Sequence, residues 1–171
     1  MARASPTVTL LLLGLSVISL VLAITQPLVS VAGYYDLHLF PDNDRFDYKV
    51  SNTHRASQAM HVLALVSLGT ALLVLIVSHF TSWPDSTFRK MSAIQRTATV
   101  FGTAFYLAGV ATLLKIAMDY KHIADDLPVA PNGSIEAGGI LDIIGFASAF
   151  VSCMFVFFST SRDNTDEYQR L

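Results

Sequence analysis

Residues 59–77 read AMHVLALVSLGTALLVLIV, a predominantly apolar stretch without Asp, Glu, Lys or Arg. A bilayer core about 30 Å thick needs about 20 helical residues at a rise of 1.5 Å each, so this stretch predicts a membrane-spanning helix. Three further stretches have a similar length and character: 8–24, 98–118 and 137–158. The sequence therefore predicts an all-α membrane protein, a four-transmembrane-helix bundle.

Composition supports a membrane class. The chain has 171 residues, of which 53% are hydrophobic and only 14% are charged. Soluble domains are about 25% charged, so the deficit indicates that much of the surface does not face water. A net charge of −2 provides no basic field for nucleic acid. Four spans in so short a chain predict a single tetraspan domain over 1–171.

The first stretch has an alternative interpretation. Arg3 followed by an apolar run also occurs in secretory signals, and residues 21–23, VLA, would be a cleavage site. The apolar run is long for a signal sequence, which favours an uncleaved helix.

Basic residues in short loops predict the orientation. With the N-terminus inside, the inner set is Arg3, Arg89, Lys90, Arg96, Arg162 and Arg170, and the outer set is Arg45, Lys49, Arg55 and Lys121. The larger inner set predicts that both termini and the tail, 159–171, are cytoplasmic. Asn132 begins the sequence Asn-Gly-Ser, an acceptor for N-glycosylation, and this topology places it outside.

The two outer loops are 32–58 and 119–136. In the first, residues 34–40 and 46–50 alternate between apolar and polar, and Pro-Asp-Asn-Asp at 41–44 favours a turn. This pattern predicts a small extracellular β-hairpin. A lone hairpin is marginally stable, so we expect it to rest on the second outer loop or on a partner. An ordered cap over the helix ends and a partner-binding surface both remain open.

Only Lys115 and Asp142 place formal charge within the four stretches. At 1.5 Å per residue, both are expected about 5–8 Å below the outer surface, on consecutive helices. We therefore predict an intramembrane ion pair between them. Two alternatives remain open, namely separate snorkelling to the interface and a role in transport.

Small residues recur at four-residue spacing in every stretch, which is typical of helices that pack closely in lipid. They are Ser19 and Ala23, Ser67 and Ala71, Ala104, Ala108 and Thr112, and Gly145, Ala149 and Cys153.

The chain resembles the claudin-like tetraspan superfamily, which includes claudins, the peripheral myelin protein group and amastins. The resemblance rests on LLLG at 11–14 with Pro27 beyond it, RASQAM at 55–60, GTAFYLAG at 102–109, and Gly139 followed by GFA at 145–147. The RASQAM segment is closest to amastins. These motifs cover all four helices in order. The resemblance implies a left-handed four-helix bundle with a small outer β-element.

The first outer loop departs from that family. It contains no cysteine and no tryptophan, whereas the family has a tryptophan-rich signature with two cysteines there. The disulfide-pinned sheet of claudins therefore cannot form, and paracellular barrier function does not follow from the resemblance.

The last residues, EYQRL, place Leu171 three positions after Tyr168. This pattern resembles the tyrosine-x-x-hydrophobic sorting motif, which would make a clathrin adaptor a partner. The physical basis is an extended peptide that presents two apolar anchors.

No motif for catalysis, phosphate binding, metal or another cofactor is recognised. We therefore expect a non-enzymatic tetraspan that organises membrane or adhesion assemblies in the plasma or endosomal membrane. Its partners would be membrane lipids and either further copies of itself or another membrane protein. The alternative is an accessory subunit of a channel, receptor or other large membrane complex.

Overall fold

The structure, a computed structural model, describes residues 6–31, 35–40, 52–81, 84–125 and 133–168. Its helices are α1 (Pro6–Thr25), α2 (Asn52–Phe80), α3 (Asp85–Asp125) and α4 (Ala137–Tyr168). All four are long and apolar enough to cross a membrane. The prediction of a four-span, all-α membrane bundle is therefore confirmed at the level of its helices.

The helices extend beyond the apolar stretches that predicted them. α2 begins at Asn52, α3 begins at Asp85, and α4 continues to Tyr168. Hydropathy marks only the part of a helix that lies in hydrocarbon, whereas Ser, Gln, Lys and Arg continue a helix into water. Residues 85–95, which lie between the second and third apolar stretches, accordingly belong to α3. The predicted tail, 159–171, is helical as far as Tyr168.

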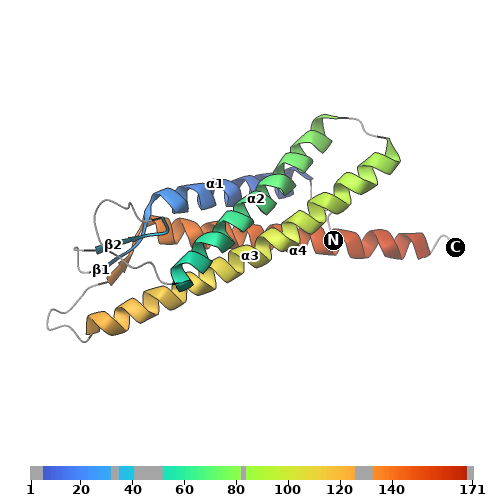
Figure 1. The fold of residues 1–171 in the computed structure, drawn as a ribbon. Helices are drawn as coiled ribbons and strands as arrows, with labels where there is room; N and C mark the ends of the chain where they lie inside the picture. The colour runs from blue at the N-terminus through green and yellow to red at the C-terminus, as the bar shows by residue number, and fades with distance from the viewer. Residues whose placement is uncertain (1–5, 32–34, 41–51, 82–83, 126–132, 169–171) are drawn as a thin grey trace.

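The helices pack mainly as two pairs, α2 along α3 and α1 along α4. Figure 1 shows α1 and α4 running side by side while α2 and α3 cross them obliquely. The start of α1 and the end of α4 lie away from the strands, at the end of the bundle where α2 leads into α3 (Figure 1). With an even number of spans, the start of α1 and the end of α4 lie at the same end of the bundle.

The core is a contiguous cluster that all four helices supply. Its fully buried members are Leu13, Leu20, Ala64, Leu68, Ala71, Tyr106 and Ala149. Close approach between α2 and α3 occurs at Gly102, where an added Cβ atom would lie 2.7 Å from Leu68 Cγ. Of the predicted small faces, Ser19, Ala23, Ala71, Gly145 and Ala149 are buried, but Ala104 is exposed. The α3 helix instead receives side chains of α2 at its glycines.

Within the described residues, three short strands form one antiparallel sheet at one end of the bundle (Figure 1). They are β1 (Pro27–Val31), β2 (Tyr35–His38) and β3 (Gly133–Ile135), in the order β2-β1-β3. In the register, Val29 of β1 lies opposite Leu37 of β2 and Ile135 of β3. The sheet therefore joins the chain segment before α2, which contains β1 and β2, to the segment after α3, which contains β3.

The sheet differs from the predicted hairpin. β2 falls within the run 34–40, but its partner is β1, which begins at Pro27 directly after α1 and lies outside the predicted outer loop. The predicted second strand, 46–50, lies outside the described residues. Strand β3 comes from the predicted second outer loop and pairs with β1 rather than with β2.

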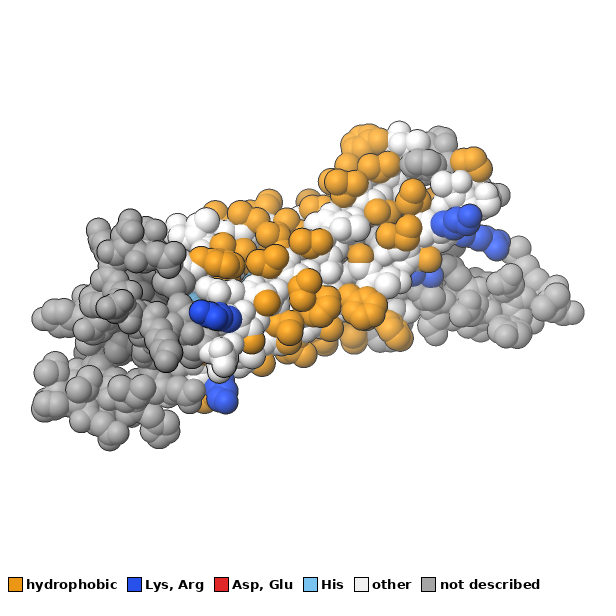
Figure 2. All heavy atoms as spheres, in the orientation of Figure 1, with side chains coloured by type: hydrophobic (Ala, Val, Ile, Leu, Met, Phe, Trp, Pro, Cys, Tyr) orange, Lys and Arg blue, Asp and Glu red, His pale blue; other side chains and the backbone are white. Residues whose placement is uncertain are grey.

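The surface of the bundle carries a broad apolar belt. Figure 2 shows hydrophobic side chains covering the middle of the visible face, with Lys and Arg side chains towards its two ends. Large exposed hydrophobic side chains come from all four helices. An apolar belt between cationic ends is the surface expected of a protein whose middle lies in lipid.

Candidate functional site

His61 lies on the buried face of α2, one turn after Ser57, with only 1% of its surface exposed. Its Nδ1 atom is 2.8 Å from the backbone carbonyl oxygen of Ser57. A carbonyl oxygen can only accept a hydrogen bond, so Nδ1 carries the hydrogen. The other ring nitrogen, Nε2, faces α4.

Asp142 meets His61 from the first turns of α4. Its Oδ2 atom is 3.3 Å from His61 Nε2, and 2% of the residue is exposed. Because Nδ1 already holds a hydrogen, Nε2 either donates a second hydrogen to a carboxylate or accepts one from a protonated carboxyl group. In both arrangements one proton is shared between the two groups, and the pair carries no net charge.

Two residues of α3 enclose the pair. An added Cβ at Gly109 would lie 2.7 Å from His61 Cε1, so the imidazole occupies space that only glycine leaves free. The Gly109 carbonyl accepts a hydrogen bond from Ser57 Oγ at 3.2 Å. Tyr106, one turn earlier, donates its hydroxyl to the Asp142 carbonyl at 3.0 Å and meets the His61 ring edge-to-face.

Gly145 of α4 makes room for the Tyr106 hydroxyl, which an added Cβ there would overlap. Ser19 of α1 borders the same position, at 3.1 Å from that Cβ. We call Ser57, His61, Tyr106, Gly109 and Asp142 the His61 cluster. It connects α2, α3 and α4 at one level, and α1 closes it at Gly145.

One atom of the His61 cluster has no hydrogen-bond partner among the described residues, namely the buried Oδ1 of Asp142. A buried polar atom without a partner costs free energy relative to its hydrated state. The Asp142 carboxyl group is therefore held in the cluster through its Oδ2 contact with His61, which makes the two side chains dependent on each other.

The predicted pair of Lys115 and Asp142 is wrong. Asp142 bonds to His61, and the Lys115 side chain is exposed. The buried residues of α3 near this level are Gly109, Leu113 and Ile116, at spacings of four and three. Lys115 lies between the last two in sequence, so it projects from a different side of the helix. Lys115 and Asp142 have similar expected depths, but the side of the helix from which each projects decides which residues meet.

A second set of polar contacts pins the segment after β2 to α2. The carbonyl of Leu39 accepts hydrogen bonds from Gln58 Nε2 at 2.7 Å and from His54 Nε2 at 2.9 Å. The Leu39 side chain is buried against Leu113 and Ile24. Leu39, just after β2, thus anchors the chain to α1, α2 and α3.

Comparisons of the chain with protein-family models, with curated proteins and with solved structures found no match. The resemblance to claudin-like proteins thus stays a prediction from motifs.

The structure does not describe the environment of the other predicted site residues, Asn132, Tyr168 and Leu171. Asn132 and Leu171 lie outside the described residues, and Tyr168 is the last residue of α4. The sorting and glycosylation hypotheses therefore remain predictions. Among the residues that the structure describes, no group of three or more His, Cys, Asp or Glu side chains could hold a metal ion.

The sequence contains a signal for His61 that formal charge alone does not reveal. The buried residues of α2 are His54, Ser57, His61, Ala64, Leu68 and Ala71, which alternate at spacings of three and four. This spacing defines one packed side of a helix. A histidine on that side must find a polar partner on another helix, and Asp142 is the charged residue of the fourth apolar stretch.

Proposed function

We propose that this protein is a non-enzymatic tetraspan that organises membrane assemblies through contacts within the bilayer and through its sheet-bearing end. The observation that carries the proposal is that polar side chains are buried between the helices, whereas many large apolar side chains are exposed on the surface of the bundle. His61 and Asp142 are almost fully buried and bond to each other. Groups this enclosed hold helices together and are poorly accessible to a solute, so the His61 cluster supports a structural role.

The surface of α1 supports assembly. Its exposed large side chains include Val8, Leu11, Leu15, Ile18 and Leu22, again at alternating spacings of three and four. We call these five residues the α1 row. Rows of this spacing pack knobs-into-holes against a like helix. Lipid is as apolar as leucine, so close packing rather than hydrophobicity would drive such contact. The occupant that this regular spacing favours is α1 of a second copy.

The orientation belongs to the same proposal. The excess of basic residues at the α2–α3 connection and termini favours a cytoplasmic location for that end and an extracellular or lumenal location for the sheet. Protection of a terminal tag from external protease in intact cells tests this arrangement, and accessible termini would reverse it. The membrane concerned would be the plasma membrane or an endosomal membrane.

Purification in mild detergent, followed by mass measurement of the intact particle, tests the proposed function. Self-assembly predicts a particle whose protein mass equals that of two or more copies of this chain. A fixed ratio of this chain to a different membrane protein would instead favour an accessory subunit. A strictly monomeric chain in both detergent and lipid nanodiscs would contradict lateral self-assembly.

A further inference from the structure

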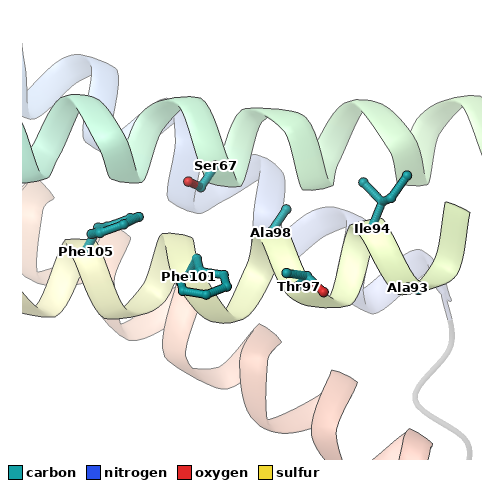
Figure 3. Close-up of a pocket in the computed structure, with 7 residues that line it drawn as sticks. All are labelled: Ser67, Ala93, Ile94, Thr97, Ala98, Phe101 and Phe105. Carbon is teal, nitrogen blue, oxygen red and sulfur yellow. The ribbon is translucent and has the colours of Figure 1, made fainter. Parts of the chain in front are cut away.

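An open groove runs between α2 and α3 on the outer surface of the bundle. Its lining includes Ser67 of α2 and Ile94, Thr97, Ala98, Phe101 and Phe105 of α3. Figure 3 shows Ile94, Ala98 and Phe105 pointing from α3 towards α2, with Ser67 pointing back towards α3. The lining is mainly apolar, and the groove is separate from the His61 cluster.

The groove crosses the boundary between lipid and water. Residues 86–97 of α3 read STFRKMSAIQRT, which is polar and cationic, whereas 98–118 is the apolar stretch. Ile94 and Thr97 therefore lie at the interface, and Ala98, Phe101 and Phe105 lie in hydrocarbon. From Ile94 to Phe105 the groove extends ~16 Å along the helix. Of that length, ~10 Å, from Ala98 to Phe105, lies in hydrocarbon, which is about two-thirds of one leaflet of a bilayer core about 30 Å thick.

A cation stands at the interfacial end of the groove. Lys90 is exposed and precedes Ile94, Thr97 and Phe101 by four, seven and eleven residues, which places it on the same side of α3. Arg89, also exposed, is its neighbour. Between Asp85 and Arg96 the chain has one acidic residue, Asp85, and three basic residues, Arg89, Lys90 and Arg96, so this segment of α3 has a net positive charge.

We propose that the groove binds an acidic phospholipid, with one acyl chain along Phe101 and Phe105 and the anionic headgroup at Lys90. Three features select this ligand. The groove faces lipid, it runs from the interface into one leaflet, and its charged end attracts phosphate and carboxylate groups. A zwitterionic lipid would fill the apolar part equally well but would lack the attraction to Lys90.

A tryptophan reporter in the groove tests the proposal on the full chain. The native Trp83 is replaced by phenylalanine, and Phe101→Trp places the reporter on a residue that is 56% exposed. The matched control is Phe150→Trp on α4, where the native side chain is 49% exposed. Each variant is reconstituted into vesicles in which either the acidic or the zwitterionic phospholipid carries brominated acyl chains, which quench nearby tryptophan.

We expect the reporter at position 101 to show about a fivefold preference for the acidic lipid, the value for one lysine near a membrane surface, and the reporter at 150 to show none. Lys90→Gln, a surface change, should abolish the preference, and high salt should reduce it. Equal quenching by the two lipids at position 101 would overturn the proposal. The same preference at both positions, or a preference that survives Lys90→Gln, would overturn it as well.

Discussion

The buried face of α2 and the α1 row have the same spacing and opposite environments. On α2 the residues at alternating spacings of three and four are two histidines, a serine, two alanines and a leucine, and all are buried. On α1 the residues at that spacing are valine, isoleucine and three leucines, and all are exposed. In a soluble protein the more apolar row would be the one inside.

The comparison shows how a bilayer alters the choice of the buried face. Lipid accepts a leucine as readily as the protein interior does, so an apolar row gains little by turning inwards. Histidine and aspartate require partners in hydrocarbon, and small residues let helices approach closely. The helices are therefore oriented about their own axes by a few polar and small residues.

The largest effect on stability is expected for His61, at the centre of the buried face of α2, and for its partner Asp142. Asp142→Leu and His61→Leu should each lower the free energy of unfolding by about 3–5 kcal/mol, because each leaves the other residue buried without its partner. Unfolding by heat or denaturant in detergent measures this change. The double variant should lose less than the sum of the two single variants, since both remove one interaction.

Lys115→Met is the control for that cycle. Its exposed side chain should contribute no more than about 0.5 kcal/mol. A strong coupling of Lys115 to Asp142, with none between His61 and Asp142, would show that the buried pair has been misassigned.

Replacing a glycine by alanine is expected to have a smaller effect on stability, and its sign should differ between two glycines. Gly109→Ala places a methyl group 2.7 Å from the His61 ring and should cost about 1–3 kcal/mol. Gly69→Ala, in α2, meets nothing within 4 Å and should stabilise the helix by up to about 1 kcal/mol. The same unfolding measurement compares the two variants. A loss of equal size at both glycines would mean that the close approach at Gly109 is unimportant.

The smallest effect on stability is expected on the α1 row. Leu11→Ala combined with Ile18→Ala removes side chains that are 66% and 60% exposed, and lipid replaces them, so unfolding should change by less than about 0.5 kcal/mol per residue. The mass of the particle in mild detergent should nevertheless fall towards that of one chain. A large loss of stability would show that the row is buried within one copy, and an unchanged mass would exclude it as the interface.

Some of the candidate site could have been predicted from the sequence. The alternating spacing of His54, Ser57 and His61 identifies the packed side of α2, and the depth of Asp142 follows from its place in α4. Neither observation identifies the pairing, because Lys115 has a similar expected depth and a full charge. The glycines at 102 and 109 were visible as a motif, but the side chains that they accept, Leu68 and His61, were not.

The sheet could likewise be predicted from the sequence only in part. Alternation located β2, but β1 is short and begins with a proline, and its pairing with β3 joins segments about a hundred residues apart. Local patterns do not report such pairings. The contacts of Leu39 with Gln58 and His54 are likewise set by how the chain folds over the end of α2.

The sequence by itself determined that four apolar helices form, because the length and hydropathy of a segment are local properties that decide whether it can cross a membrane. Only the tertiary structure decided that Asp142 meets His61, that Lys115 faces outwards, and that β1 lies between β2 and β3. These outcomes depend on the rotation of each helix about its axis and on which helices are neighbours. Both are settled by packing among all four helices at once, and no single segment contains that information.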